Sequence, residues 1–191
     1  MYLFRNIIFI LFILSGFYLN AQSTQLYSTK SGVIKYDLNG RKQGSEVIYF
    51  DNYGKLFSDL RSTTAIIAGD TIEESYLNIY KHDTLFEINL NKHTFILSKS
   101  TGLPNSNKLI SAEMIDVLGY KNCGTEEIAG ISCNIYSGDY GKLWIWNNIV
   151  LKSEMEIMDI IITTQATTYL TNIEIPESKF EIPKKLRQIN Q

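Results

Sequence analysis

The stretch TIEESYLNIYKHDTLFEINLNKHTFILS, residues 71–98, contains three β-prone runs separated by short polar joints. The runs cover residues 71–80, 84–90 and 94–98, and each joint between them is only three residues long. Connections this short join antiparallel hairpins, so strands that follow one another along the chain lie side by side in the sheet. The stretch therefore predicts an up-and-down antiparallel meander.

The same pattern continues on both sides of this stretch. Further β-prone runs, separated by Asn, Gly, Asp and Lys turns, cover residues 31–38, 46–50, 55–60, 122–128, 131–137, 140–146, 150–158 and 161–175. Alternation of apolar and polar residues, as in SGVIKYDL at 31–38, is typical of strands with one buried face. We therefore predict a mainly β fold of the α+β class with meander topology.

One segment breaks the strand pattern. Residues 107–118 place apolar side chains such as Met114 and Leu118 at helical spacing. Ser106 or Asn107 can cap the first amides of a helix there, and Gly119 can take the left-handed conformation that ends one. We predict one amphipathic helix at about 107–118, whose apolar face lies against the sheet or lines a groove.

The N-terminal region has the features of an export signal. Arg5 is followed by the apolar run IIFILFIL at 7–14 and then by small and polar residues ending at Ala21-Gln22. A basic start, a short apolar core and a small residue define a secretory signal, and spanning a membrane needs roughly 20 apolar residues. We predict a cleavable signal peptide at 1–22, a single domain at 23–185 and a loose tail at 186–191. Since this region holds no cysteine, we expect a periplasmic or secreted protein without a lipid anchor.

Charge and motif content disfavour several classes of function. The chain has 18 basic and 20 acidic residues, and this balance does not attract nucleic acid. His82 and His93 lie in consecutive turns of the meander, which fall at opposite ends of the sheet, so they predict no shared metal site. Glu126 and Glu127 are adjacent on a strand and point to opposite faces, and no nucleophile or phosphate-binding motif occurs. We expect no enzyme activity, catalytic residue, metal or cofactor.

Cys123 and Cys133 form an even pair in a chain that we expect to be exported, where disulfides persist. They fall on the two strands of a predicted hairpin that turns at Ala129-Gly130. We predict a structural disulfide between them, with two free buried thiols as the alternative. Closing a loop of about 10 residues would stabilise the fold by roughly 2.5–3 kcal/mol.

Trp144 and Trp146 are two residues apart on one predicted strand, so they project from the same face, with Leu143 and Ile145 on the other. Both faces of this strand are apolar. Either the strand is central and covered on both sides, or one face lines an open apolar concavity of the kind that binds ligands. For the second case we predict Trp144, Trp146 and Met114 as ligand-binding residues.

A combined signature runs in order over nearly the whole predicted mature chain. Its parts are residues 31–38, 46–54 (EVIYFDNYG), 123–133 (CGTEEIAGISC), 142–146 (KLWIW), 149–153 (IVLKS) and 180–183 (FEIP). Together they resemble a group of exported Gram-negative proteins of uncharacterised function, which is itself similar to the periplasmic lipoprotein carriers of the LolA/LolB type. The resemblance implies a strongly curved, unclosed antiparallel sheet, a half-barrel, with the helix at about 107–118 against its apolar concave face.

The resemblance also implies a ligand class, namely acyl chains, lipids or lipoprotein anchors. Burying an acyl chain gains about 0.8 kcal/mol per methylene without any specific polar partner, so such a site leaves little motif in a sequence. The leading hypothesis is therefore a periplasmic binding or carrier protein for a lipid or lipoprotein acyl chain. The alternative is a secreted structural or interaction domain with a filled core that binds an envelope protein, and a hydrolase ranks third. After signal cleavage we expect no transmembrane segment.

Overall fold

The structure is a computed structural model that describes residues 25–99 and 108–189. The predicted signal peptide at 1–22 and the first position of the predicted helix, Asn107, therefore lie outside the described residues. Within the described ranges, no helix is long and apolar enough to cross a membrane.

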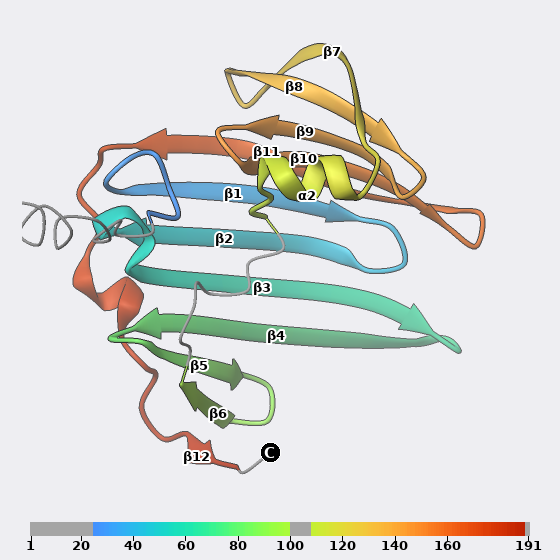
Figure 1. Cartoon of the computed structure of the whole chain (residues 1–191). Helices are drawn as coiled ribbons and strands as arrows, with labels where there is room; N and C mark the ends of the chain where they lie inside the picture. The colour runs from blue at the N-terminus through green and yellow to red at the C-terminus, as the bar shows by residue number, and fades with distance from the viewer. Residues whose placement is uncertain (1–24, 100–107, 190–191) are drawn as a thin grey trace, which may run out of the picture.

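The described residues form one sheet of 12 strands and a short α-helix (Figure 1). The strands are β1 (Gly32–Asn39), β2 (Gln43–Asp51), β3 (Leu56–Ile67), β4 (Asp70–Lys81), β5 (Thr84–Asn89), β6 (Thr94–Lys99), β7 (Lys121–Ile128), β8 (Ile131–Gly138), β9 (Gly141–Trp146), β10 (Ile149–Ile157), β11 (Ile160–Thr171) and β12 (Arg187–Gln188). Their order in the sheet is β12-β6-β5-β4-β3-β2-β1-β11-β10-β9-β8-β7. The predicted meander is confirmed as two runs, β1 to β6 and β7 to β11, which are joined where β1 pairs with β11.

The sheet is curved and its two edge strands, β7 and β12, do not pair with each other, which confirms the predicted unclosed half-barrel (Figure 1). Every pairing is antiparallel except that of β12 with β6. Residues 187–188, within the predicted loose tail, form β12 beside Thr94 and Phe95. Two short 3-10 helices, η1 (Asn52–Gly54) and η2 (Glu177–Phe180), complete the described elements.

Two-residue turns join the strands of several hairpins and so place consecutive strands side by side. In five of them both residues have positive φ: Ala68-Gly69, His82-Asp83, Ala129-Gly130, Asn147-Asn148 and Met158-Asp159. Turns of this type have a twist that matches the right-handed twist of the strands on either side. His82 is therefore a turn residue, and β5 separates it from His93.

The helix α2 (Ala112–Val117) is shorter than the predicted helix at 107–118. The segment before it is extended, because Val150 N donates to Lys108 O and Leu109 forms a β-bridge with Ile149. The side chain of Ser111 then caps the helix by accepting from Met114 N, and Gly119 follows its end with a φ of 72°. The backbone of 108–110 thus bonds to the sheet instead of forming a first helical turn.

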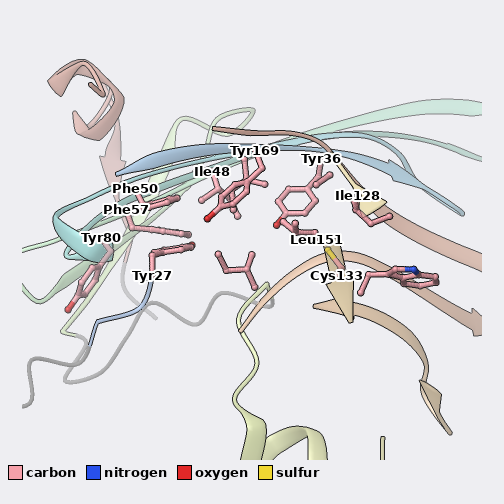
Figure 2. Close-up of a cluster of buried hydrophobic side chains, with 14 residues drawn as sticks. Tyr27, Tyr36, Ile48, Phe50, Phe57, Tyr80, Ile128, Cys133, Leu151 and Tyr169 are labelled. Atoms are coloured by element: carbon pink, nitrogen blue, oxygen red, sulfur yellow. The ribbon is translucent and has the colours of Figure 1, made fainter. Parts of the chain in front are cut away.

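A cluster of aromatic and aliphatic side chains fills part of one face of the sheet, which we call the inner face (Figure 2). Tyr36 of β1 and Phe50 of β2 lie on this face and are almost completely buried. Tyr27 stacks on Phe50, with ring centroids 3.9 Å apart and planes within 7°. Aromatic pairs stabilise a fold by more than the burial of their surface alone, so this cluster stabilises the middle of the sheet.

The predicted disulfide between Cys123 and Cys133 is not present, since both cysteines are free. Cys133 lies opposite Glu126 in the β7–β8 ladder, whereas Cys123 sits in a bulge between Asn122 and Gly124. The two thiols are therefore offset by three positions along the strands, about 10 Å, whereas a disulfide needs Cα atoms within about 7 Å. Cys133 is buried and Cys123 is exposed, so the alternative of two buried thiols is correct for Cys133 alone.

Candidate functional site

A cavity of about 630 Å³ lies beside the buried cluster, on the inner face at the end where β1 turns into β2. We call it the main cavity. Its apolar lining consists of Leu38, Leu143, Val150, Met155 and Ile162, and its basic lining consists of Arg41, Lys42, Arg61 and Lys108. Ligand pockets in proteins commonly have volumes of about 300–1,000 Å³, with mostly apolar walls and a few polar groups. The main cavity has this size and this composition.

The strand register shows which residues form the wall of the main cavity. Leu38 of β1 pairs with Thr164 of β11, Thr164 pairs with Ser153 of β10, and Ser153 pairs with Leu143 of β9. Directly paired residues of neighbouring strands lie on the same face of a sheet. One row across four strands, with its neighbours Met155 and Ile162, therefore forms a continuous wall.

The basic side chains of the β1–β2 turn lie at one end of the main cavity, and each is held by a different hairpin. Lys42 forms an ion pair with Glu74 of β4. Arg41 Nη2 lies 3.4 Å from the sulfur of Met158, in the turn between β10 and β11. Both cations remain near the surface, where they can meet an anionic group.

Lys108 and Arg61 lie deeper and meet at a buried carboxylate. Glu46 of β2 is completely buried, and its Oε2 accepts from Arg61 Nη2 and from Lys108 Nζ, each at 3.1 Å. Glu46 is flanked in the ladder by Tyr36 and Arg61, and the Lys108 ammonium lies 4.8 Å from the centre of the Tyr36 ring. This cluster fixes the segment before α2 to the inner face of the sheet.

Asp59 of β3 adds a second carboxyl beside this cluster. Its burial, followed by the negative charge of Glu46, raises the pKa of Asp59 to about 7, although Arg61 and Lys108 act in the opposite direction. Burial also lowers the pKa of Lys108 from its usual value, against the opposing effect of Glu46. A second, more polar cavity of about 520 Å³ lies between Asp59 and β6 and shares Arg61 with the main cavity.

The pKa of Asp59 predicts a pH-dependent stability difference. Between about pH 4 and 7 the folded protein holds a proton on Asp59 that the unfolded chain has released, so this carboxyl stabilises the fold more as the pH falls. Asn at this position cannot titrate. We expect the free energy of unfolding of the wild type, relative to Asp59→Asn, to rise from pH 7 to pH 4 in urea denaturation. A difference that stays constant over this range would contradict the assignment.

The three predicted ligand-binding residues do not line the main cavity. Trp144 is 5% exposed in the buried cluster, where its Nε1 donates to Glu126 and the Lys152 ammonium lies 4.2 Å from its ring centre. Trp146 contacts the edge of Tyr169, and Met114 is half-exposed on α2. On the opposite face of the strand that carries the tryptophans, Leu143 lines the main cavity.

Helix α2 packs on that opposite face of β9. Ile115 is buried in a second cluster with Tyr120, Ile145 of β9 and Val150 of β10. That the helix lies against the concave face stays a prediction; in the structure Ile115 is buried, whereas Met114 is half-exposed. Among the described residues, no group of three or more His, Cys, Asp and Glu side chains is placed to hold a metal ion.

No protein-family model matches the sequence, and no curated protein is significantly similar to it. Solved structures with a similar fold include an uncharacterized conserved protein from Thermus thermophilus, with a TM-score of 0.56, 8% identity, and coverage of 86% of this chain and 92% of that one. MucB is similar with a TM-score of 0.53 and 11% identity over 85% of this chain and 60% of that one. The structure of the Pseudomonas aeruginosa MucA/MucB complex is similar with a TM-score of 0.51 and 10% identity over 83% of this chain and 58% of that one.

These likenesses concern the fold alone, because the identities are only 8–11%. The chain spans about 60% of the length of MucB. The shared feature is the curved, unclosed antiparallel sheet. This is the half-barrel that the resemblance to LolA/LolB-type carriers implies.

Proposed function

We propose that the protein is a binding module of the bacterial envelope that holds the acyl chain of a lipid or lipoprotein in the main cavity. The observation that carries the proposal is the set of apolar side chains that line this cavity, Leu38, Leu143, Val150, Met155 and Ile162, with the cations of Arg41 and Lys42 at one end. An acyl chain gains about 0.8 kcal/mol for each methylene it buries, and an anionic headgroup would lie near the two cations. The export signal predicted at 1–22 would direct such a carrier to the periplasm or out of the cell, without a lipid anchor.

A second candidate is binding of a partner protein. The aromatic cluster fills much of the inner face, as expected of a domain with a filled core. MucB, which has a similar fold, has been solved in complex with MucA. Both functions fit one half-barrel, because the filled part and the main cavity occupy different parts of the inner face.

The acyl-chain proposal predicts a strong effect at Ile162 and none at its neighbour. Ile162→Glu puts a carboxylate into the apolar wall, where an alkyl chain would have to desolvate it. We expect the affinity for a fluorescent fatty acid to fall by about 10-fold or more, in line with a cost of about 1–3 kcal/mol for an unsatisfied buried polar group. Displacement of the probe by palmitate measures the affinity.

Ile161→Glu is the matched control, since Ile161 is on the same strand, points to the opposite face and is 60% exposed. Its affinity for the probe should stay within about 2-fold of the wild type, as surface substitutions are nearly neutral. Native mass spectrometry of protein from its own envelope should also show a bound lipid. Protein that is always recovered bare and does not bind fatty acids or lipopeptides would refute the proposal.

A further inference from the structure

Polar side chains of β3, β4 and β5 line the second cavity, the one that lies between Asp59 and β6. They form two rows of directly paired residues on the inner face, where Asp59, Asn78 and Glu87 make up one row and Arg61, Tyr76 and Asn89 the next. Each row crosses two interstrand steps, or about 10 Å, and the rows lie about 7 Å apart along the strands. The two rows thus form a polar patch that one sugar ring with its substituents can cover.

These polar side chains do not contribute to the apolar packing of the sheet. On the opposite face of β4 and β5, Ile79 and Ile88 are almost completely buried, so the core contacts of these strands are made there. Among the described residues, the Asn78 amide, the Tyr76 hydroxyl and the Glu87 carboxylate have no hydrogen-bond partner. Their donors and acceptors are therefore available to a ligand in the second cavity.

The charges that line the second cavity nearly cancel. The charged residues of its lining are Asp59, Glu87, Arg61 and Lys92. Arg61 donates to the buried Glu46, and burial, followed by the charge of Glu46, raises the pKa of Asp59 to about 7. One carboxylate, that of Glu87, and one ammonium, that of Lys92, remain. The lining therefore favours neither an anion nor a cation, but a neutral ligand that forms many hydrogen bonds.

A sugar ring has the groups that such a lining can bind. Each hydroxyl is one donor and two acceptors, so neighbouring hydroxyls can bond to carboxyl and amide groups at the same time. The apolar part of the lining, which includes Tyr76, Ile96 and Ile189, can contact the C–H groups of the ring. The volume of about 520 Å³ is within the range of about 300–1,000 Å³ that is common for ligand sites.

The place of the site in the sheet disfavours an extended peptide as its ligand. Such a peptide binds by adding a strand to the edge of a sheet, where backbone groups are unpaired. Strands β3, β4 and β5 lie between β2 and β6, so their backbones are paired on both sides (Figure 1). The groups that remain are side chains spread in two directions over one face, which suits a ring better than a linear backbone.

We propose that the second cavity is a binding site for a neutral saccharide. Hydroxyls of the sugar bond to Asp59, Asn78 and Glu87, and its C–H groups contact Tyr76. The site shares Arg61 and Tyr76 with the main cavity but none of its apolar lining. The proposal therefore stands whether or not the main cavity holds an acyl chain.

NMR titration of the whole exported protein with glucose, N-acetylglucosamine, maltose and diacetylchitobiose tests the site, at concentrations up to about 10 mM so that millimolar affinities are detected. We expect at least one of these sugars to bind. Asn78→Ala/Glu87→Ala should weaken that binding by about 10-fold or more, because it removes hydrogen bonds to the ligand, one of them from a charged group.

The matched control is Asn134→Ala/Glu73→Ala, which removes the same two types of side chain from exposed positions on β8 and β4. Neither residue lines either cavity, and Glu73 is on the face of β4 opposite to Asn78. This control should bind the sugar within about 2-fold of the wild type. Circular dichroism spectra equal to that of the wild type show that both double variants are folded.

Binding of a monosaccharide would assign the site to a single sugar unit, and binding of a disaccharide alone would assign it to a glycan chain. No binding of any of the four sugars by the wild type, equal losses in the two double variants, or binding of a blocked tetraglycine peptide in place of the sugars would each overturn the proposal. Ile162→Glu separates this site from the acyl-chain function, because Ile162 lines the main cavity and not the second. It should weaken fatty-acid binding and leave sugar binding unchanged.

Discussion

Replacing Glu46 with alanine is expected to lower the free energy of unfolding by about 3–5 kcal/mol, the usual cost of breaking a buried ion pair. Glu46 is fully buried and accepts from both Arg61 and Lys108, so its loss leaves the buried Lys108 ammonium without this carboxylate, whereas Arg61 is partly exposed. The Lys108 side chain also fixes the segment that leads into α2. Urea denaturation followed by circular dichroism measures the effect.

The ion pair between Lys42 and Glu74 provides the matched comparison, because the Glu74 side chain is 34% exposed whereas that of Glu46 is fully buried. Glu74→Ala should change the free energy of unfolding by less than about 1 kcal/mol, as exposed pairs do. A loss for Glu46→Ala as small as that for Glu74→Ala would show that the buried cluster does not stabilise the fold.

Replacing Trp144 with alanine is expected to cost about 3–5 kcal/mol of stability, in the range found when a large buried aromatic side chain is removed. Trp144 is buried in the same cluster as Cys133 and Ile128, and the change removes both the hydrogen bond to Glu126 and the contact with Lys152. Since Trp144 does not line the main cavity, the folded variant should bind the fatty-acid probe as the wild type does.

Met114→Ala is the comparison for Trp144, since Met114 is half-exposed on α2 and should tolerate the change to within about 0.5 kcal/mol. Measuring both the free energy of unfolding and the affinity for the fatty-acid probe distinguishes a side chain that packs the core from one that contacts the ligand. Loss of fatty-acid binding by a Trp144→Ala protein that is still folded would identify Trp144 as a ligand-binding residue.

The meander was predictable because short joints such as Ala129-Gly130 and Asn147-Asn148 interrupt β-prone runs, and joints this short restrict the connection to hairpins. The extension of the β3–β4 hairpin over residues 65–72 was not predicted. Residues 63–67, TTAII, favour strands by composition, but the alternation of polar and apolar residues stops where both faces are exposed. Spacing alone also favoured a helix from 107, because a sequence does not show that Val150 bonds to Lys108.

Of the candidate site, the sequence allowed us to predict only one strand that lines it. The two-faced pattern of β9 identified a strand that lines the cavity, but which face does so depends on the position of α2 and on the bulge in β10. The contact of Glu46 with Arg61 and Lys108 joins residues from β2, β3 and the segment before α2. Cross-strand register and the path of a connecting segment decide such contacts, and neither is visible in local sequence.

Pairing of β1 with β11 makes the folding rate depend on a late, long-distance event. Each meander can form from hairpins closed by nearby residues, on a timescale of about 1–10 µs per hairpin. The seam between them must bring together residues as remote as Ser31 and Ile173, whose hydrogen bond spans 142 positions. Loop closure over such a distance slows folding. Until it is complete, β1 and β11 are exposed edges of the two meanders. Two chains would therefore first associate wrongly at these edges.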